Sequence, residues 1–78
     1  MNKKIEKAIG NNIRKLREEK GMTQELFAAK IQLEGLDITR SAVAKMEVGQ
    51  RHIYPDEIIV IKRVLGVSYD EIFDYESK

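Results

Sequence analysis

Residues 37–51, with the sequence DITRSAVAKMEVGQR, carry the side chains in this chain that are best suited to recognition chemistry. Successive residues of a helix are about 100° apart, so one side of a helix here would carry Arg40, Ser41, Ala44 and Lys45. Another side would be apolar and would pack against a core: Ala42, Val43 and Met46. Guanidinium, hydroxyl and ammonium groups donate hydrogen bonds, and small residues let a ligand approach the backbone. The pattern indicates a short binding helix.

Catalytic chemistry has few candidate groups in this sequence. His52 is the only histidine, there is no cysteine, and no cluster of carboxylates is expected on an apolar wall. General acid–base catalysis and thiolate metal sites are therefore disfavoured. We predict a protein that is not an enzyme, has no cofactor or metal and acts on no small-molecule substrate. His52 is expected at the surface or in a loop.

Length and charge indicate one small domain with a cationic face. A chain of 78 residues is near the lower limit for folding without disulfides or metals, and we expect one domain over residues 1–78 with a core at about 5–74. Residues 1–51 hold 11 Lys/Arg and 7 Asp/Glu, which gives +4, whereas residues 52–78 hold 3 and 6, which gives −3. A mixed solvated surface with a chance imbalance is the alternative.

Nothing in the sequence predicts a membrane segment. The longest purely aliphatic block is IIVI at residues 58–61, far short of the roughly 20 residues that cross a bilayer. The basic start MNKKIEKAIG is not followed by the apolar stretch of a signal peptide. The absence of cysteine is compatible with a reducing compartment, and we predict a cytoplasmic protein.

Helical periodicity recurs along the whole chain. Ile5, Ile9, Ile13 and Leu16 draw an apolar stripe, with Lys4, Glu6, Lys7, Arg14, Lys15, Glu18 and Glu19 among the residues between them. Gly10 costs about 1 kcal/mol relative to alanine, so this helix is expected to fray or to begin only near it.

Caps and glycine stops delimit four more helices. Thr23, Thr39 and Ser68 are suitable N-caps, Pro55 suits a first helical position, and Gly21, Gly35 and Gly66 are suitable stops. We expect an all-α, compact five-helix bundle without strands, and a loosely held C-terminal YESK. The predicted core comprises Ile13, Leu16, Phe27, Ile31, Ala42, Val43, Met46, Ile58, Ile61 and Leu65.

A helix that begins after Thr39, small-residue-rich and polar near its start, follows another short helix and a turn. This arrangement is typical of a helix-turn-helix, whose second helix enters a major groove about 12 Å wide with its first turns against base edges. Small residues permit that approach, and the hydrogen-bond donors within residues 37–51 would face the bases.

The segments IRKLREEKGMTQELFAAKI, ITRSAVAKMEVGQR and VLGVSYDEIF resemble the Cro/repressor-type (XRE-type) helix-turn-helix DNA-binding family. The resemblance runs from about Ile9 to Phe73. G-M-T-Q, S-x-V/I-x-K-x-E-x-G and L-G-V-S-x-D-E-I occur in the family's order, which makes the signal specific. It implies a lambda-repressor-like fold and a transcriptional regulator, most simply a repressor, that binds double-stranded DNA. Because each half-site would offer few contacts, we expect a homodimer on a palindromic operator.

The resemblance also implies residue roles. Base contacts would come from Arg40, Ser41, Ala44 and Lys45. Phosphate contacts would come from Gln24, Thr39, Gln50, Arg51 and Lys15. Arg17 and Glu47 would form a structural ion pair. From the residues alone, Arg40 and Lys45 could instead contact phosphates or be solvated, and Ser41 could simply satisfy the first turn of its helix.

One departure from the family is the link QLEGLD, which occupies a place normally filled by about one residue. We expect the preceding helix to be one turn longer, with Gly35 as its stop and Leu36 covering the added turn. Glu34 and Asp37 should then point away from phosphates.

Two surface features leave a second reading open. The block EIIVIKRVLG has more apolar residues than one stripe needs, so Ile59 or Val60, with Phe73 and Tyr75, could form a homodimer contact through the helix at 55–65 and the C-terminal region. The mixed charge and the acidic link also fit a protein-interaction module of the same fold, such as an antitoxin or antirepressor component.

Overall fold

The computed structural model describes residues 2–75, which form five helices and no strand. The helices are α1 (Lys3–Glu19), α2 (Gln24–Leu33), α3 (Arg40–Glu47), α4 (Pro55–Leu65) and α5 (Tyr69–Phe73). The all-α five-helix prediction is confirmed. Of the tail predicted to be loosely held, residues 76–78 lie outside the described part. Within that part, no helix has the length and hydropathy that crossing a membrane requires.

The helix at the N-terminus begins well before Gly10, which corrects the expectation of a frayed or late start. Asn2 caps α1 by accepting hydrogen bonds from the Lys4 and Ile5 N–H groups at 2.8 and 3.3 Å, and the helix continues through Gly10. A Cβ atom on Gly10 would overlap the carbonyl oxygen of Met46 in α3. Glycine is therefore present because the two helix backbones touch, not because the helix ends there.

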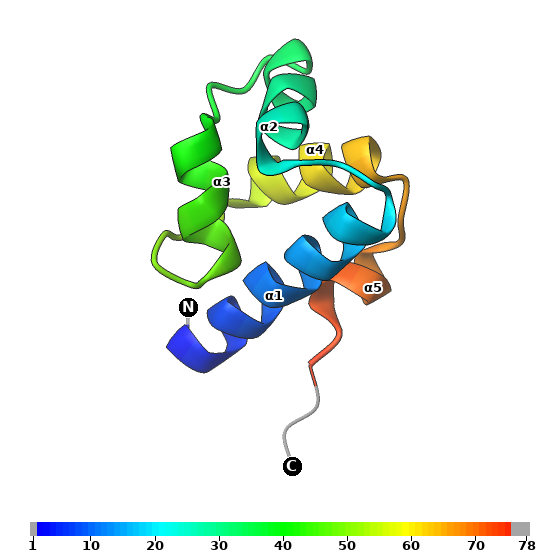
Figure 1. The fold of residues 1–78 in the computed structure, drawn as a ribbon. Coiled ribbons are helices and arrows are strands. Elements are labelled where there is room, and N and C mark those ends of the chain that lie inside the picture. Colours follow the sequence, from blue (N-terminus) through cyan, green and yellow to red (C-terminus); the bar gives the residue numbers. More distant parts are fainter. Residues whose placement is uncertain (1, 76–78) are drawn as a thin grey trace.

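The core is built around α3, which packs against both α1 and α2. On either side of it, α5 packs against α1 and α4 packs against α2 (Figure 1). All residues predicted to be in the core are buried except Ala42, which is partly buried against it. On α4, Val60 is buried and Ile59 is 46% exposed, so Ile59 is the aliphatic residue that faces outward. This packing leaves α3 at one edge of the bundle (Figure 1).

The longer link follows the predicted course. Helix α2 ends at Leu33 and Gly35 has a φ of 97°, as expected of a helix stop. Gln32 Nε2 donates to the Ile38 carbonyl at 2.7 Å, Ile38 is buried and Leu36 packs partly buried against the core. Arg63 Nη1 holds Glu34 at 2.9 Å. The link is thus bonded at both ends, although Leu33 in the added turn is 86% exposed.

Glu6, expected among the polar residues between the apolar positions, is instead buried. Its carboxylate lies 3.0 Å from His52 Nδ1 and accepts a weaker hydrogen bond from the Ile53 N–H at 3.4 Å. The hydrogen bond with His52 lowers the pKa of Glu6 below its usual value, against the opposing effect of burial. His52 itself lies in a loop and is exposed, as predicted, but it ties that loop to α1.

Candidate nucleic-acid interface

Helix α3 presents its polar side outward. Thr39 caps it, with Oγ1 accepting from the Ala42 N–H at 3.1 Å. Arg40, Ser41 and Lys45 are exposed and Ala44 is partly buried, whereas Val43 and Met46 on the opposite side are fully buried. Among the interactions within residues 2–75, no hydrogen bond or ion pair engages the side chain of Arg40 or Lys45. Both cationic groups are therefore accessible to a hydrogen-bond acceptor outside the protein.

A buried polar cluster fixes the C-terminal end of α3. Arg17 Nε donates to Glu47 Oε2 at 2.7 Å and Arg17 Nη2 donates to Glu47 Oε1 at 3.1 Å. Arg17 Nη1 also donates to the Met22 carbonyl at 2.8 Å. The ion pair that the family resemblance implied is thus present. Because both charges are buried and fully bonded, the cluster sets how α3 sits against α1.

Gln24, an implied phosphate contact, belongs to the same cluster. Its Nε2 donates to Glu47 Oε1 at 3.0 Å, so the side chain is turned toward α3. Thr23 Oγ1 accepts from the Leu26 N–H at 3.0 Å and caps α2. The first turn of α2 still offers backbone N–H groups to an anion, as helix N-termini do.

The implied phosphate contacts after α3 lie in two different environments. Gln50 is exposed, whereas Arg51 makes a two-pronged pair with Glu57, with N–O distances of 2.9 and 3.0 Å. Burial raises the pKa of Glu57, but hydrogen bonds from Arg51 and from the Tyr54 N–H outweigh it and leave the pKa below its usual value. Arg51 therefore fastens the loop to α4, a partnership that the sequence did not suggest.

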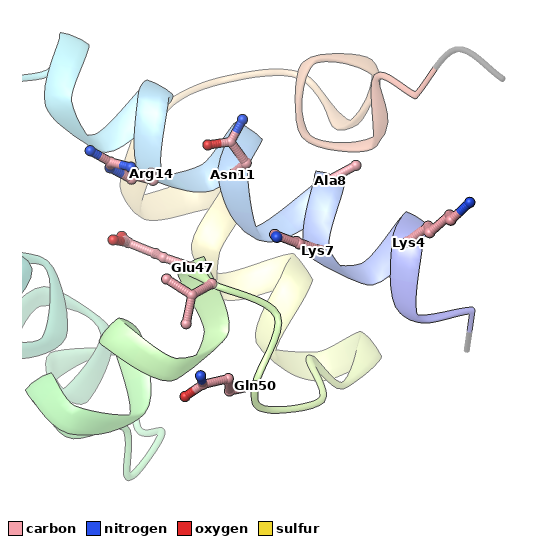
Figure 2. A pocket seen from close by; sticks show the side chains of 8 residues that line it. Lys4, Lys7, Ala8, Asn11, Arg14, Glu47 and Gln50 are labelled. Atoms are coloured by element: carbon pink, nitrogen blue, oxygen red, sulfur yellow. The ribbon is translucent and has the colours of Figure 1, made fainter. Parts of the chain in front are cut away.

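An open groove of about 550 Å³ lies between the first half of α1 and the end of α3 (Figure 2). Its lining residues include Lys4, Lys7, Asn11 and Arg14 from α1, with Val48 and Gln50 from the other wall. These α1 residues were not predicted as a site. Their spacing of three, four and three residues places them on one side of a helix and could have revealed them. Lys15, an implied phosphate contact, is exposed one turn beyond Asn11.

A family model described as helix-turn-helix matches residues 13–72 of this chain, from the middle of α1 to α5. The chain therefore belongs to the Cro/repressor-type helix-turn-helix family, and the family resemblance of its sequence is confirmed. No curated protein and no solved structure matches it. Membership supports, in general terms, a DNA-binding regulator.

Proposed function

We propose that the protein is a sequence-specific transcriptional repressor that places α3 in the major groove of double-stranded DNA. The observation that carries this proposal is the exposure of Arg40 and Lys45 on a helix whose other side, Val43 and Met46, is buried. With its side chains an α-helix is about 10–12 Å in diameter, which fits a major groove about 12 Å wide. An arginine at a helix N-terminus opposes the helix dipole, which favours a functional reason for Arg40.

In this proposal, base contacts and phosphate contacts come from different residues. Arg40 and Lys45 read base edges, with Ser41 and Ala44 beside them where the backbone comes close. Phosphates are held by Thr39, Gln50, Lys15 and the first turn of α2 at Gln24. Arg51 contributes chiefly by fixing the loop through Glu57, because its guanidinium is already engaged there.

A homodimer would raise the affinity that one short helix provides. Ile59 on α4 and Tyr69, Phe73 and Tyr75 at the C-terminal end are exposed, and the rings of Tyr69 and Phe73 stack with centroids 6.4 Å apart. We place the dimer contact on these residues. Two copies would then bind a palindromic operator with half-sites about 34–36 Å apart, and occupancy of the operator in the cytoplasm would block polymerase without catalysis.

The test is a binding selection from random duplex DNA at a stated salt concentration, followed by Arg40→Ala on the recovered duplex. We expect a palindromic motif, a loss of about 1–3 kcal/mol and relaxed preference at one base position. Equal weakening on every duplex would make Arg40 a phosphate contact. A selection that recovers no motif would refute specific recognition.

The second candidate is a protein-interaction module, and the exposed apolar residues of α4 and α5 favour it. In that case the wild-type protein would bind no DNA, and Arg40→Ala would weaken binding to a protein partner. The selection therefore separates the two candidates.

A further inference from the structure

The first turns of α1 lie outside the residues that the helix-turn-helix model matches, yet they are built into the fold. The match begins at residue 13, whereas α1 begins at Lys3. Glu6 anchors this extension to the loop after α3 through His52 and Ile53. Gly49 in that loop lies so close that a Cβ atom there would be 2.9 Å from Lys7 Cβ. The extension therefore has a fixed position beside α3.

This fixed extension lines the groove of Figure 2 with cations. Lys4, Lys7 and Arg14, with Asn11 between them, lie within residues 4–14 of the helix, and the rise from the first to the last is about 15 Å. Lys4 and Lys7 are exposed. The acid among the lining residues is Glu47, and both its oxygens are bonded to Arg17 or Gln24. Arg14 forms an exposed ion pair with Glu18, with 3.6 Å between Arg14 Nε and Glu18 Oε2. The groove thus offers positive charge and amide donors.

The groove is continuous with the outer face of α3. Val48 lines it and follows Ala44 by four residues, so the two lie on the same side of the helix end. Gln50, on the same wall, is an implied phosphate contact. A chain of phosphates that runs along the outer face of α3 would therefore reach the groove at the C-terminal end of the helix.

We propose that this groove, lined by Lys4, Lys7, Asn11, Arg14 and Gln50, binds the sugar-phosphate backbone of DNA beside the site that α3 reads. The proposal rests on the proposed function and adds contacts from Lys4, Lys7 and Asn11, which lie outside the residues that the family model matches. A strand presents one phosphate about every 3.4 Å of helix axis, and the spacing along the winding strand itself is larger. A wall of about 15 Å can therefore follow at least two consecutive phosphates. The contact contributes affinity and register but no base preference.

The experiment compares Lys4→Gln/Lys7→Gln with the wild-type protein on the duplex recovered by selection and on a scrambled duplex of equal length. Each phosphate contact contributes about 0.9 to the slope of log K against log salt, so the slope should decrease by about 1.8. Between 50 and 200 mM salt the wild type should therefore lose about tenfold more affinity than the variant. The reduction should be equal on both duplexes. Lys4→Arg/Lys7→Arg should restore the wild-type slope.

The matched control is Lys20→Gln/Lys30→Gln, which removes the same charge from exposed positions outside the groove. Its slope should remain close to that of the wild type. If the groove variant behaves like this control, the groove does not touch DNA and the proposal is wrong, even though DNA binding by α3 stands. If the wild type binds no duplex, the proposed function itself fails. Should the double variant melt early, Lys4→Gln alone should lower the slope by about 0.9.

Discussion

Two clusters hold α3 and its following loop against α1, and they differ in depth. The inner cluster joins Arg17, Glu47 and Gln24, and the Arg17 and Glu47 side chains are 8% and 1% exposed. The outer cluster joins Glu6 to His52, whose side chain is 68% exposed although that of Glu6 is 4% exposed. Charges removed from water interact strongly and are poorly screened, whereas the interaction with an exposed partner is weakened by water and salt. The inner cluster therefore sets the position of α3, and the outer cluster attaches the loop to α1 more weakly.

Breaking the inner cluster should have the largest effect on stability. Arg17→Ala would leave the buried Glu47 carboxylate without its charged partner, at a cost of about 3–5 kcal/mol in the free energy of unfolding. Arg14→Ala is the matched control on the same helix, because its pair with Glu18 is exposed and should contribute about 0–1 kcal/mol. Thermal and urea unfolding of both variants measure the difference. Equal melting temperatures would show that the buried pair does not brace the fold.

Separating α1 from α3 should have a smaller but clear effect. Gly10→Ala places a methyl group against the Met46 carbonyl, and the two backbones must move apart. Such overpacking typically costs about 1–3 kcal/mol, although alanine is the better helix former by about 1 kcal/mol. Asn11→Gln, on the side of α1 that faces the groove, is the control and should unfold like the wild type. A Gly10→Ala protein of raised stability would mean that the helices are not in backbone contact.

Local signals in the sequence predicted the helices, whereas distant partners were missed. Thr23, Thr39 and Ser68 cap helices through hydrogen bonds to residues three positions away, so the sequence pattern contains all of the information. The bonds of Glu6 to His52 cross 46 residues, and no local pattern encodes them. Helical periodicity does place Glu6 on the side of Ile9 and Ile13, but its charge argued for solvent.

The candidate site divides in the same way. The outward direction of Arg40 and Lys45 follows from helical periodicity, because Val43 and Met46 must be inside. The pair between Arg17 and Glu47 was implied only by the family resemblance, since a contact between two helices has no signature in one sequence. Helical spacing could have revealed the row of α1 residues that lines the groove. The other wall of the groove and the engagement of Arg51 by Glu57 depend on how the loop packs, which the sequence pattern does not determine.

Breaking the outer cluster should have the smallest effect on stability, and the size of that effect should change with pH. The pKa of Glu6 lies below its usual value in the folded protein, chiefly because of the hydrogen bond with His52. A lowered carboxyl pKa contributes stability that is present above the unfolded value of about 4.5 and is lost as pH falls through the folded value. We therefore expect Glu6→Gln to melt below the wild type at pH 7, and the gap to narrow on acidification below pH about 4.5.

The control for this titration is Glu71→Gln at the cap of α5. The pKa of Glu71 is also lowered, by hydrogen bonds from the Ser68 N–H and hydroxyl groups, but this carboxylate lies far along the chain from the loop. Both variants should therefore show a pH-dependent gap in melting temperature. Only Glu6→Gln should also increase amide hydrogen exchange in residues 48–54, because of these two carboxylates only that of Glu6 bonds to the loop. Unchanged exchange there at pH 7 would mean that packing and the pair between Arg51 and Glu57 hold the loop without Glu6. The outer cluster would then have no part in positioning the loop.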